Sequence, residues 1–191
     1  MKNENENLKK ADELLHEGCN KINEKDLRGA IDKFSKAIEL NPNYDKAYGN
    51  RGAAKYLLND IEGAIKDYNK AIELNPKKVD AYTNRGVLNC ELKNYQDAIE
   101  DFTKAIELVP DAYQYYRRGW AKLDLGTFQS AVEDFNKAIE LNPNVTDYYI
   151  GRGQALLECA GEDFHKALNI DPTNEDAIFF AGLIDDMHGN V

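Results

Sequence analysis

Cysteine, proline and tryptophan are scarce in this chain: its 191 residues include 3 cysteines, 5 prolines and 1 tryptophan. Cys19, Cys90 and Cys159 are far apart and no CxxC pair occurs, which argues against a disulfide framework or a cysteine-based zinc site. We expect three free thiols in a reducing, cytoplasmic setting. There is no run of about 18 uncharged apolar residues, and the first residues lack the apolar stretch of a signal peptide, so no membrane span or leader is expected.

Positive charge is also in short supply. Lys and Arg total 24 against 34 Asp and Glu, which gives a net charge of −10. Nucleic acids and anionic membranes are therefore disfavoured as partners, because binding phosphates requires clustered Lys and Arg. The remaining expectation is a protein or peptide partner.

Catalytic patterns are missing as well. The chain has neither a glycine-rich phosphate loop nor a nucleophile elbow, and its three histidines are His16, His165 and His188. His16 and Cys19 are three residues apart beside Asp12, but ligands on one helix with none elsewhere make a weak metal site. We expect no enzyme activity, no metal and no cofactor.

A repeated segment dominates what is present. "KAIELNP" at 36–42 returns at 70–76 and 137–143, as "KAIELVP" at 104–110 and as "KALNIDP" at 166–172. All five prolines end these copies: Pro42, Pro76, Pro110, Pro143 and Pro172. The spacings between them are 34, 34, 33 and 29 residues. A fixed period of this length indicates an array of stacked units.

Small and aromatic residues recur in step with the prolines. Each copy has an Ala, an aromatic four residues later and a second Ala three residues after that, as in Ala64, Tyr68 and Ala71. Four copies also place a Gly twelve residues before the first Ala: Gly18, Gly52, Gly86 and Gly119. Apolar spacing predicts two helices per copy, separated by short polar breaks such as Asn59-Asp60. The small residues would let the two helices approach closely, with the aromatic filling the space behind them.

This period and residue pattern resemble the tetratricopeptide repeat over roughly residues 11–174. The resemblance implies an all-α fold, a right-handed α-solenoid of antiparallel helix pairs. We expect a single domain over 1–191, with repeats at about 11–44, 45–78, 79–111, 112–145 and 146–174. A capping helix is expected at about 175–188, where it would cover the apolar face of the last repeat.

The chain departs from the family pattern at the residue before each Gly, where arginine replaces the usual leucine. These arginines are Arg51, Arg85, Arg118 and Arg152. Aspartates recur just before the packing aromatics at Asp67, Asp101, Asp134 and Asp163. We predict that they pair as a structural ladder; the alternative is that the arginines face a ligand.

The fifth copy lacks five residues between its helices. Gly153 and Ala160 are seven residues apart where the other copies have twelve. Either Ala160-Gly161 forms a tight turn or the two helices fuse. Gly161 as a helix breaker, with Asp163 and Phe164 in repeat register, favours the turn. Fusion would open the solenoid and allow domain swapping.

The fourth copy concentrates aromatic and basic residues in "YQYYRRGWAKLDLG", residues 113–126. In the family, the first helices line a concave groove. By this register Tyr113, Tyr116, Arg117 and Trp120 fall at groove positions, while Tyr115 and Gly119 face the core. Aromatics and Arg are typical of binding hot spots. The alternative is that Trp120 only packs between neighbouring first helices.

Asn50 and Asn84 precede Arg117 at one groove position of successive repeats, and such amides suit hydrogen bonding to an extended peptide. The carboxylate clamp that some co-chaperones of this family use is incomplete here. The acids Asp12, Asp80, Glu91 and Asp147 flank the groove and favour a ligand with apolar and basic groups. We therefore predict a non-enzymatic protein–protein interaction module that binds a peptide or protein segment in its groove. The alternative is an assembly protein, a homo-oligomer joined through solenoid ends or the shortened fifth repeat.

Overall fold

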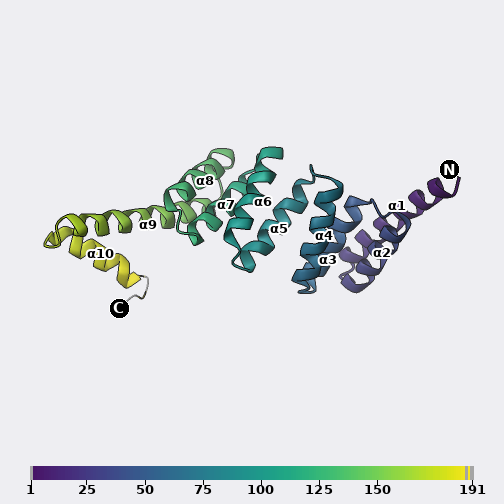
Figure 1. Cartoon of the computed structure of the whole chain (residues 1–191), viewed down its shortest axis with the longest axis horizontal. Coiled ribbons are helices and arrows are strands. Elements are labelled where there is room, and N and C mark those ends of the chain that lie inside the picture. The colour runs from purple at the N-terminus through teal and green to yellow at the C-terminus, as the bar shows by residue number, and fades with distance from the viewer. Residues whose placement is uncertain (1, 188, 190–191) are drawn as a thin grey trace. The chain divides into compact units, whose positions relative to one another are not determined.

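The computed structural model of the chain describes residues 2–187 and 189. Ten helices lie within these residues, joined by short turns, and no strand occurs among them. They form two compact units, Met1–Val109 and Pro110–Val191, and each unit is described by itself. Both are built from antiparallel helix pairs, the arrangement of an α-solenoid (Figure 1).

The first unit contains three helix pairs. Their bounds are α1 (Lys2–Asn23), α2 (Leu27–Leu40), α3 (Asp45–Leu57), α4 (Ile61–Leu74), α5 (Val79–Glu91) and α6 (Tyr95–Leu108). Each first helix packs on the second helix of its own pair, and α3 and α5 also contact the second helix of the preceding pair. Neighbouring first helices touch too, because α3 contacts both α1 and α5.

The pairs close as the repeat pattern predicts. Phe34, Tyr68 and Phe102 are at most 1% exposed and lie against the glycines of their own first helices. A Cβ added at Gly52 would lie 3.0 Å from the Tyr68 ring and 3.2 Å from a backbone oxygen. The glycines therefore permit a helix approach that a larger side chain would prevent.

The turn within each pair depends on one residue of positive φ. Lys25, Asn59 and Lys93 adopt φ values of 60–63°, and Gly126 fills the same role in the second unit with φ 79°. At the next residue, Asp26 and Asp60 accept hydrogen bonds from backbone N–H groups of the following helix. A left-handed residue followed by a helix cap reverses the chain within a few residues.

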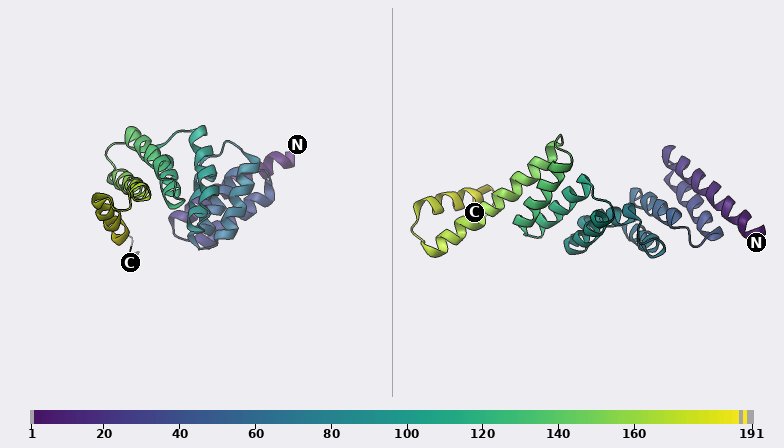
Figure 2. Two further views of the ribbon diagram at one scale, coloured as in Figure 1. Left: turned by 60° about the vertical axis from the view of Figure 1, so that its left-hand side comes forward. Right: turned by 90° about the horizontal axis from the view of Figure 1, so that it is seen from above.

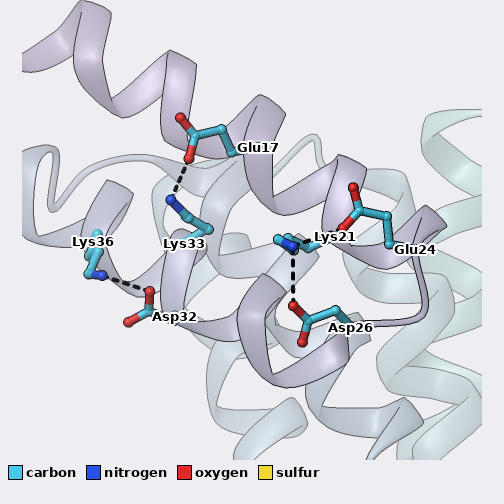
Figure 3. A network of polar contacts seen from close by, with 7 residues as sticks. All are labelled: Glu17, Lys21, Glu24, Asp26, Asp32, Lys33 and Lys36. Carbon is cyan, nitrogen blue, oxygen red and sulfur yellow. Dashed lines mark hydrogen bonds and ion pairs between the residues drawn. The ribbon is translucent and has the colours of Figure 1, made fainter.

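Several ion pairs lie on the surface of the first helix pair, α1 and α2. Lys33 of α2 bonds Glu17 of α1, and Lys21 bonds both Glu24 and Asp26 (Figure 3). These groups are largely exposed, and exposed ion pairs contribute little to stability because water screens them. The close packing of the pair therefore depends on its buried apolar residues.

The second unit contains α7 (Ala112–Asp124), α8 (Phe128–Leu141), α9 (Thr146–Ile170) and α10 (Glu175–Met187). Helices α7 and α8 form a regular pair around Phe135, which is fully buried. Helix α10 folds back along α9, as the views in Figure 2 show. The predicted capping helix is thus present through Met187, and position 188 lies outside the described residues.

The favoured expectation for the fifth copy was wrong. Helix α9 runs without interruption from Thr146 to Ile170, so Ala160 and Gly161 form no turn. The five missing residues correspond to the turn residue and its neighbours in the other copies, and continued helix satisfies the backbone hydrogen bonds instead. Gly161 acts as a packing residue: it is buried, and a Cβ there would lie 3.3 Å from Ile184 of α10.

Candidate functional site

The predicted site residues all lie on first helices. Asn50 is on α3 and Asn84 is on α5, both in the first unit. Tyr113, Tyr116, Arg117 and Trp120 are on α7 in the second unit. The two sets are therefore described separately.

Tyr113, Arg117 and Trp120 follow one another along one face of α7, and we call this set the α7 stripe. Tyr113 is 45% exposed, and Arg117 and Trp120 are partly exposed. The Arg117 guanidinium carbon lies 5.9 Å from the centre of the Tyr113 ring, within the range of a cation–π contact. As predicted, Gly119 is buried on another face, and Tyr115 packs against the apolar cluster around Tyr148.

Trp120 and Tyr116 also take part in packing. Their rings lie 5.9 and 6.2 Å from that of Phe135 on α8, both edge to face. Tyr116 further contacts Tyr148 of α9 at 5.1 Å. Sequence reasoning gave Tyr148 no part, yet it joins the two first helices of this unit. Trp120 therefore combines packing with partial exposure, and Tyr113 is the most exposed residue of the stripe.

Two donor atoms of the stripe lack acceptors. Arg117 Nε and Trp120 Nε1 are closed to solvent, and neither has a hydrogen-bond partner among the described residues. A buried polar group without a partner costs roughly 1–3 kcal/mol. A small movement of these side chains toward a ligand oxygen would recover that energy.

In the first unit, the two amides already have neighbours. Asn50 Nδ2 donates to Cys19 Sγ at 3.4 Å. Both residues line a hollow of about 260 Å³ with Phe34 and Leu57, between α1, α2 and α3. Asn84, which is exposed, hydrogen-bonds the Tyr68 side chain, whose pKa burial raises to about 12. The amides thus link successive repeats as well as facing outward.

Two of the acids predicted to flank the groove also accept hydrogen bonds from tyrosines. Tyr44 donates its hydroxyl proton to Asp12, and Tyr56 donates to Glu91. Burial, together with the hydrogen bond to Asp12, raises the pKa of Tyr44 well above its usual range. These contacts connect α1 with the start of α3, and α3 with α5.

The arginine ladder is structural in three of its four steps. Arg51, Arg85 and Arg118 bond Asp67, Asp101 and Asp134, and all three aspartates are nearly inaccessible. The two carboxylate oxygens of Asp134 accept from Arg118 Nε at 2.8 Å and Nη2 at 2.7 Å. The fourth pair does not form: Arg152 bonds Asn136, and Asp163 bonds Lys166.

Each of the three buried aspartates also contacts a second residue. Lys55 and Lys122 lie 2.8 Å from Asp67 and Asp134, whereas Asn89 donates to Asp101 at 3.1 Å. Burial raises the pKa of Asp101, against the opposing effect of Arg85. These residues follow each arginine by four positions, so the recurring Lys or Asn at that spacing could have predicted the second contact from the sequence.

No cluster of three potential metal ligands occurs among the described residues. His188 lies outside them. None of the described helices combines the length and apolarity needed to cross a membrane. Cys19, Cys90 and Cys159, which all lie within the described chain, form no disulfide.

Family models match the chain in three places. A "TPR repeat" model covers residues 52–93, and the "Tetratricopeptide repeat" model covers 79–111 and 112–145. Small glutamine-rich tetratricopeptide repeat-containing protein 2 of Mycosarcoma maydis is 47% identical over 49 residues, which are 26% of this chain and 14% of that protein. The beta form from Rattus norvegicus is 43% identical over 54 residues, 28% and 18% of the two chains. The match thus spans less than a fifth of these relatives.

Solved structures agree over more of the chain. The crystal structure of MamA has a TM-score of 0.74 at 22% identity, covering 93% of this chain and 91% of that one. YrrB, described as "a TPR protein with an unusual peptide-binding site", has a TM-score of 0.61 at 28% identity. That match covers 82% of this chain and 84% of YrrB.

Proposed function

Because the chain is a tetratricopeptide-repeat protein, and so a protein–protein interaction module, we propose that it acts without catalysis by binding a peptide or protein segment along its first helices. The α7 stripe carries this proposal. It combines an exposed tyrosine, a guanidinium stacked above it and two donors without acceptors. Tryptophan, tyrosine and arginine are enriched among the few residues that carry most of the binding energy at protein interfaces. The peptide-binding site named for YrrB supports the same use of this fold.

The ligand we propose is an extended segment with apolar and basic side chains. Its backbone carbonyl oxygens would accept from Arg117 and Trp120, and its apolar groups would lie on Tyr113. The net charge of −10 favours approach of a basic partner, and this attraction weakens with salt. Asn50 and Asn84 extend the proposed surface in the first unit. The absence of disulfides between the three cysteines supports a cytoplasmic setting.

A phage-displayed peptide library panned against the protein tests this proposal. The test variant is Tyr113→Ala with Arg117→Ala, which removes the cation–π pair of the stripe and leaves the Trp120–Phe135 contact in place. Lys137→Ala is the control, because its side chain is 56% exposed on α8, a second helix of the same unit.

Selected peptides should bind the wild type and the control alike. They should bind the double variant at least about 10-fold more weakly, which corresponds to a loss of about 1.4 kcal/mol of binding free energy. They should be rich in Lys or Arg and lose affinity as salt rises. Equal binding to all three proteins would exclude the α7 stripe as the site. Circular dichroism establishes that each variant is folded.

Self-association is the second candidate function. The uninterrupted α9 favours it, because the C-terminal part of this helix extends away from α8, with α10 folded back along it (Figure 1).

A further inference from the structure

We propose that α9 pairs with α9 of a second copy of this chain, so that each copy supplies the helix that the other copy's fifth repeat lacks. This inference gives the proposed self-association its surface, and it is independent of binding at the α7 stripe. It follows from the packing positions that stay open in the fifth repeat.

The fifth repeat keeps its packing residues but leaves them without their usual partners. Gly153, in register with Gly119, is exposed, and a Cβ there would meet nothing within 4 Å. Phe164, in register with the fully buried Phe135, is only partly buried. Its ring stacks on Phe180 of α10 at 5.0 Å, so one side is covered by the following helix. Phe135, by contrast, also lies against Gly119 of its own first helix and is fully buried.

The ion-pair ladder breaks at the same place. Arg152 Nη1 donates to Asn136 at 3.0 Å, much as Arg85 bonds Asn69. Arg152 is thus held in its regular position, but among the described residues it forms no ion pair. Asp163, the acid in ladder register, is 78% exposed and bonds only Lys166 on its own helix.

The length of the deletion brings the open positions into phase. Gly153 and Phe164 are 11 residues apart, close to three turns of 3.6 residues, as are Arg152 and Asp163. The face therefore continues along one side of a single helix through Gly153, Leu157, Ala160, Phe164 and Ala167. Within one helix the paired residues are about 16 Å apart along the axis, because the rise is 1.5 Å per residue, so they cannot meet.

An antiparallel second copy satisfies every open position twice. In the regular pairs, Arg85 meets Asp101 and Gly86 meets Phe102, both from antiparallel helices. If Gly153 of one copy meets Phe164 of the other, the same register sets Arg152 beside the other copy's Asp163. The two-fold axis then passes between Leu157 and Ala160. This interface is self-complementary in shape and in charge, as a two-fold dimer requires.

The same pairing would cover a further apolar residue. Ile150 is 52% exposed and stands at the repeat position of Tyr116, which packs on Tyr148 of the next first helix. In the dimer, α10 of the second copy occupies the place of that next helix.

Sedimentation equilibrium over a concentration series tests the pairing. We expect a mass twice the 21.6 kDa of the chain. Gly153→Glu should raise the dimer dissociation constant about 100-fold or more, because the glutamate side chain would occupy the space that Phe164 of the second copy needs and would bury a carboxylate there. The monomer should stay folded, since this position is open and Glu favours helix over Gly. Gly182→Glu on α10, also without neighbours within 4 Å, is the matched control and should leave the dimer intact.

A charge exchange identifies the contact independently. Arg152→Asp and Asp163→Arg should each weaken the dimer, and an equimolar mixture of the two variants should restore it, since each copy then supplies the complement of the other. A wild-type chain that stays at 21.6 kDa throughout would overturn the proposal, as would a dimer that tolerates both Gly153→Glu and the single charge reversals. Peptide binding at the α7 stripe is measured separately, so failure of one proposal leaves the other standing.

Discussion

Asp134 is the residue whose removal should most clearly reveal how these helix pairs are held. Its side chain is 5% exposed and its two oxygens accept from Arg118, while Lys122 lies 2.8 Å away. Asp134→Ala would leave two cations side by side, each only 15% exposed, with no anion between them. Breaking a buried ion pair by removing one partner costs about 3–5 kcal/mol.

The greater helix propensity of alanine returns only about 0.5 kcal/mol. We therefore expect the free energy of unfolding of the second unit to fall by about 3 kcal/mol. The chain has a single tryptophan, and Trp120 contacts Phe135, which follows Asp134 in sequence. Its fluorescence during urea unfolding thus reports on this unit, while circular dichroism follows the whole chain.

Glu140→Ala is the control, because it removes an acid from the same helix whose side chain is 67% exposed and whose pair with Lys137 is local. It should change the unfolding free energy by less than about 1 kcal/mol. Combining Asp134→Ala with Arg118→Ala should cost less than the sum of the single changes, because both substitutions remove the same Arg118–Asp134 contact. A loss below about 1 kcal/mol for Asp134→Ala would refute the view that the ladder is a structural ion pair.

Three other substitutions probe the same packing. Asn89→Lys sets an ammonium group beside Asp101. The pKa of Asp101 is raised in the folded state, so this residue stabilises the fold below its ordinary pKa of 3.8, and that stabilisation is lost as the pH rises through the raised pKa. The variant should therefore be less stable than wild type near pH 3, where Asp101 is protonated, and about 1 kcal/mol more stable at pH 7. Urea titrations at both pH values measure this; the same difference in unfolding free energy between variant and wild type at the two pH values would contradict it. Lys93→Gly should raise stability by about 1 kcal/mol in thermal unfolding, because its φ of 60° is strained for a side chain; no gain would mean that the turn carries no strain. Gly151→Ala should lower stability by about 1–2 kcal/mol, since its Cβ would lie 2.5 Å from the enclosed Phe135 ring, and a stabilised variant would show that the ring shifts freely.

Much of the fold could be predicted from periodicity. The repeat of small residues, packing aromatics and prolines indicated helix pairs, and Gly86 against Phe102 shows the predicted contact. The arginine ladder was predictable too, because Arg85 and Asp101 recur at one spacing in successive copies. Local patterns of this kind determine structure when every copy carries the same turn.

The candidate site was only partly predictable. The helical register placed Tyr113 on an exposed face and Gly119 on a buried one. It did not show that Trp120 packs edge to face on Phe135, nor that Tyr148 joins the cluster. Those contacts depend on how three helices meet, which spacing along one helix does not contain.

By itself, the sequence determined the helix pairs and three of the four pairs of the arginine ladder, because these follow from periods of 3.6 and about 34 residues. Only the tertiary structure decided the fate of the fifth copy. A glycine at 161 suits either a turn or a close helix contact, and in the structure it makes the contact, with Ile184 of α10, 23 residues away. The missing turn residues left continued helix as the conformation that satisfies the backbone, and among the described residues this leaves Gly153 of α9 exposed.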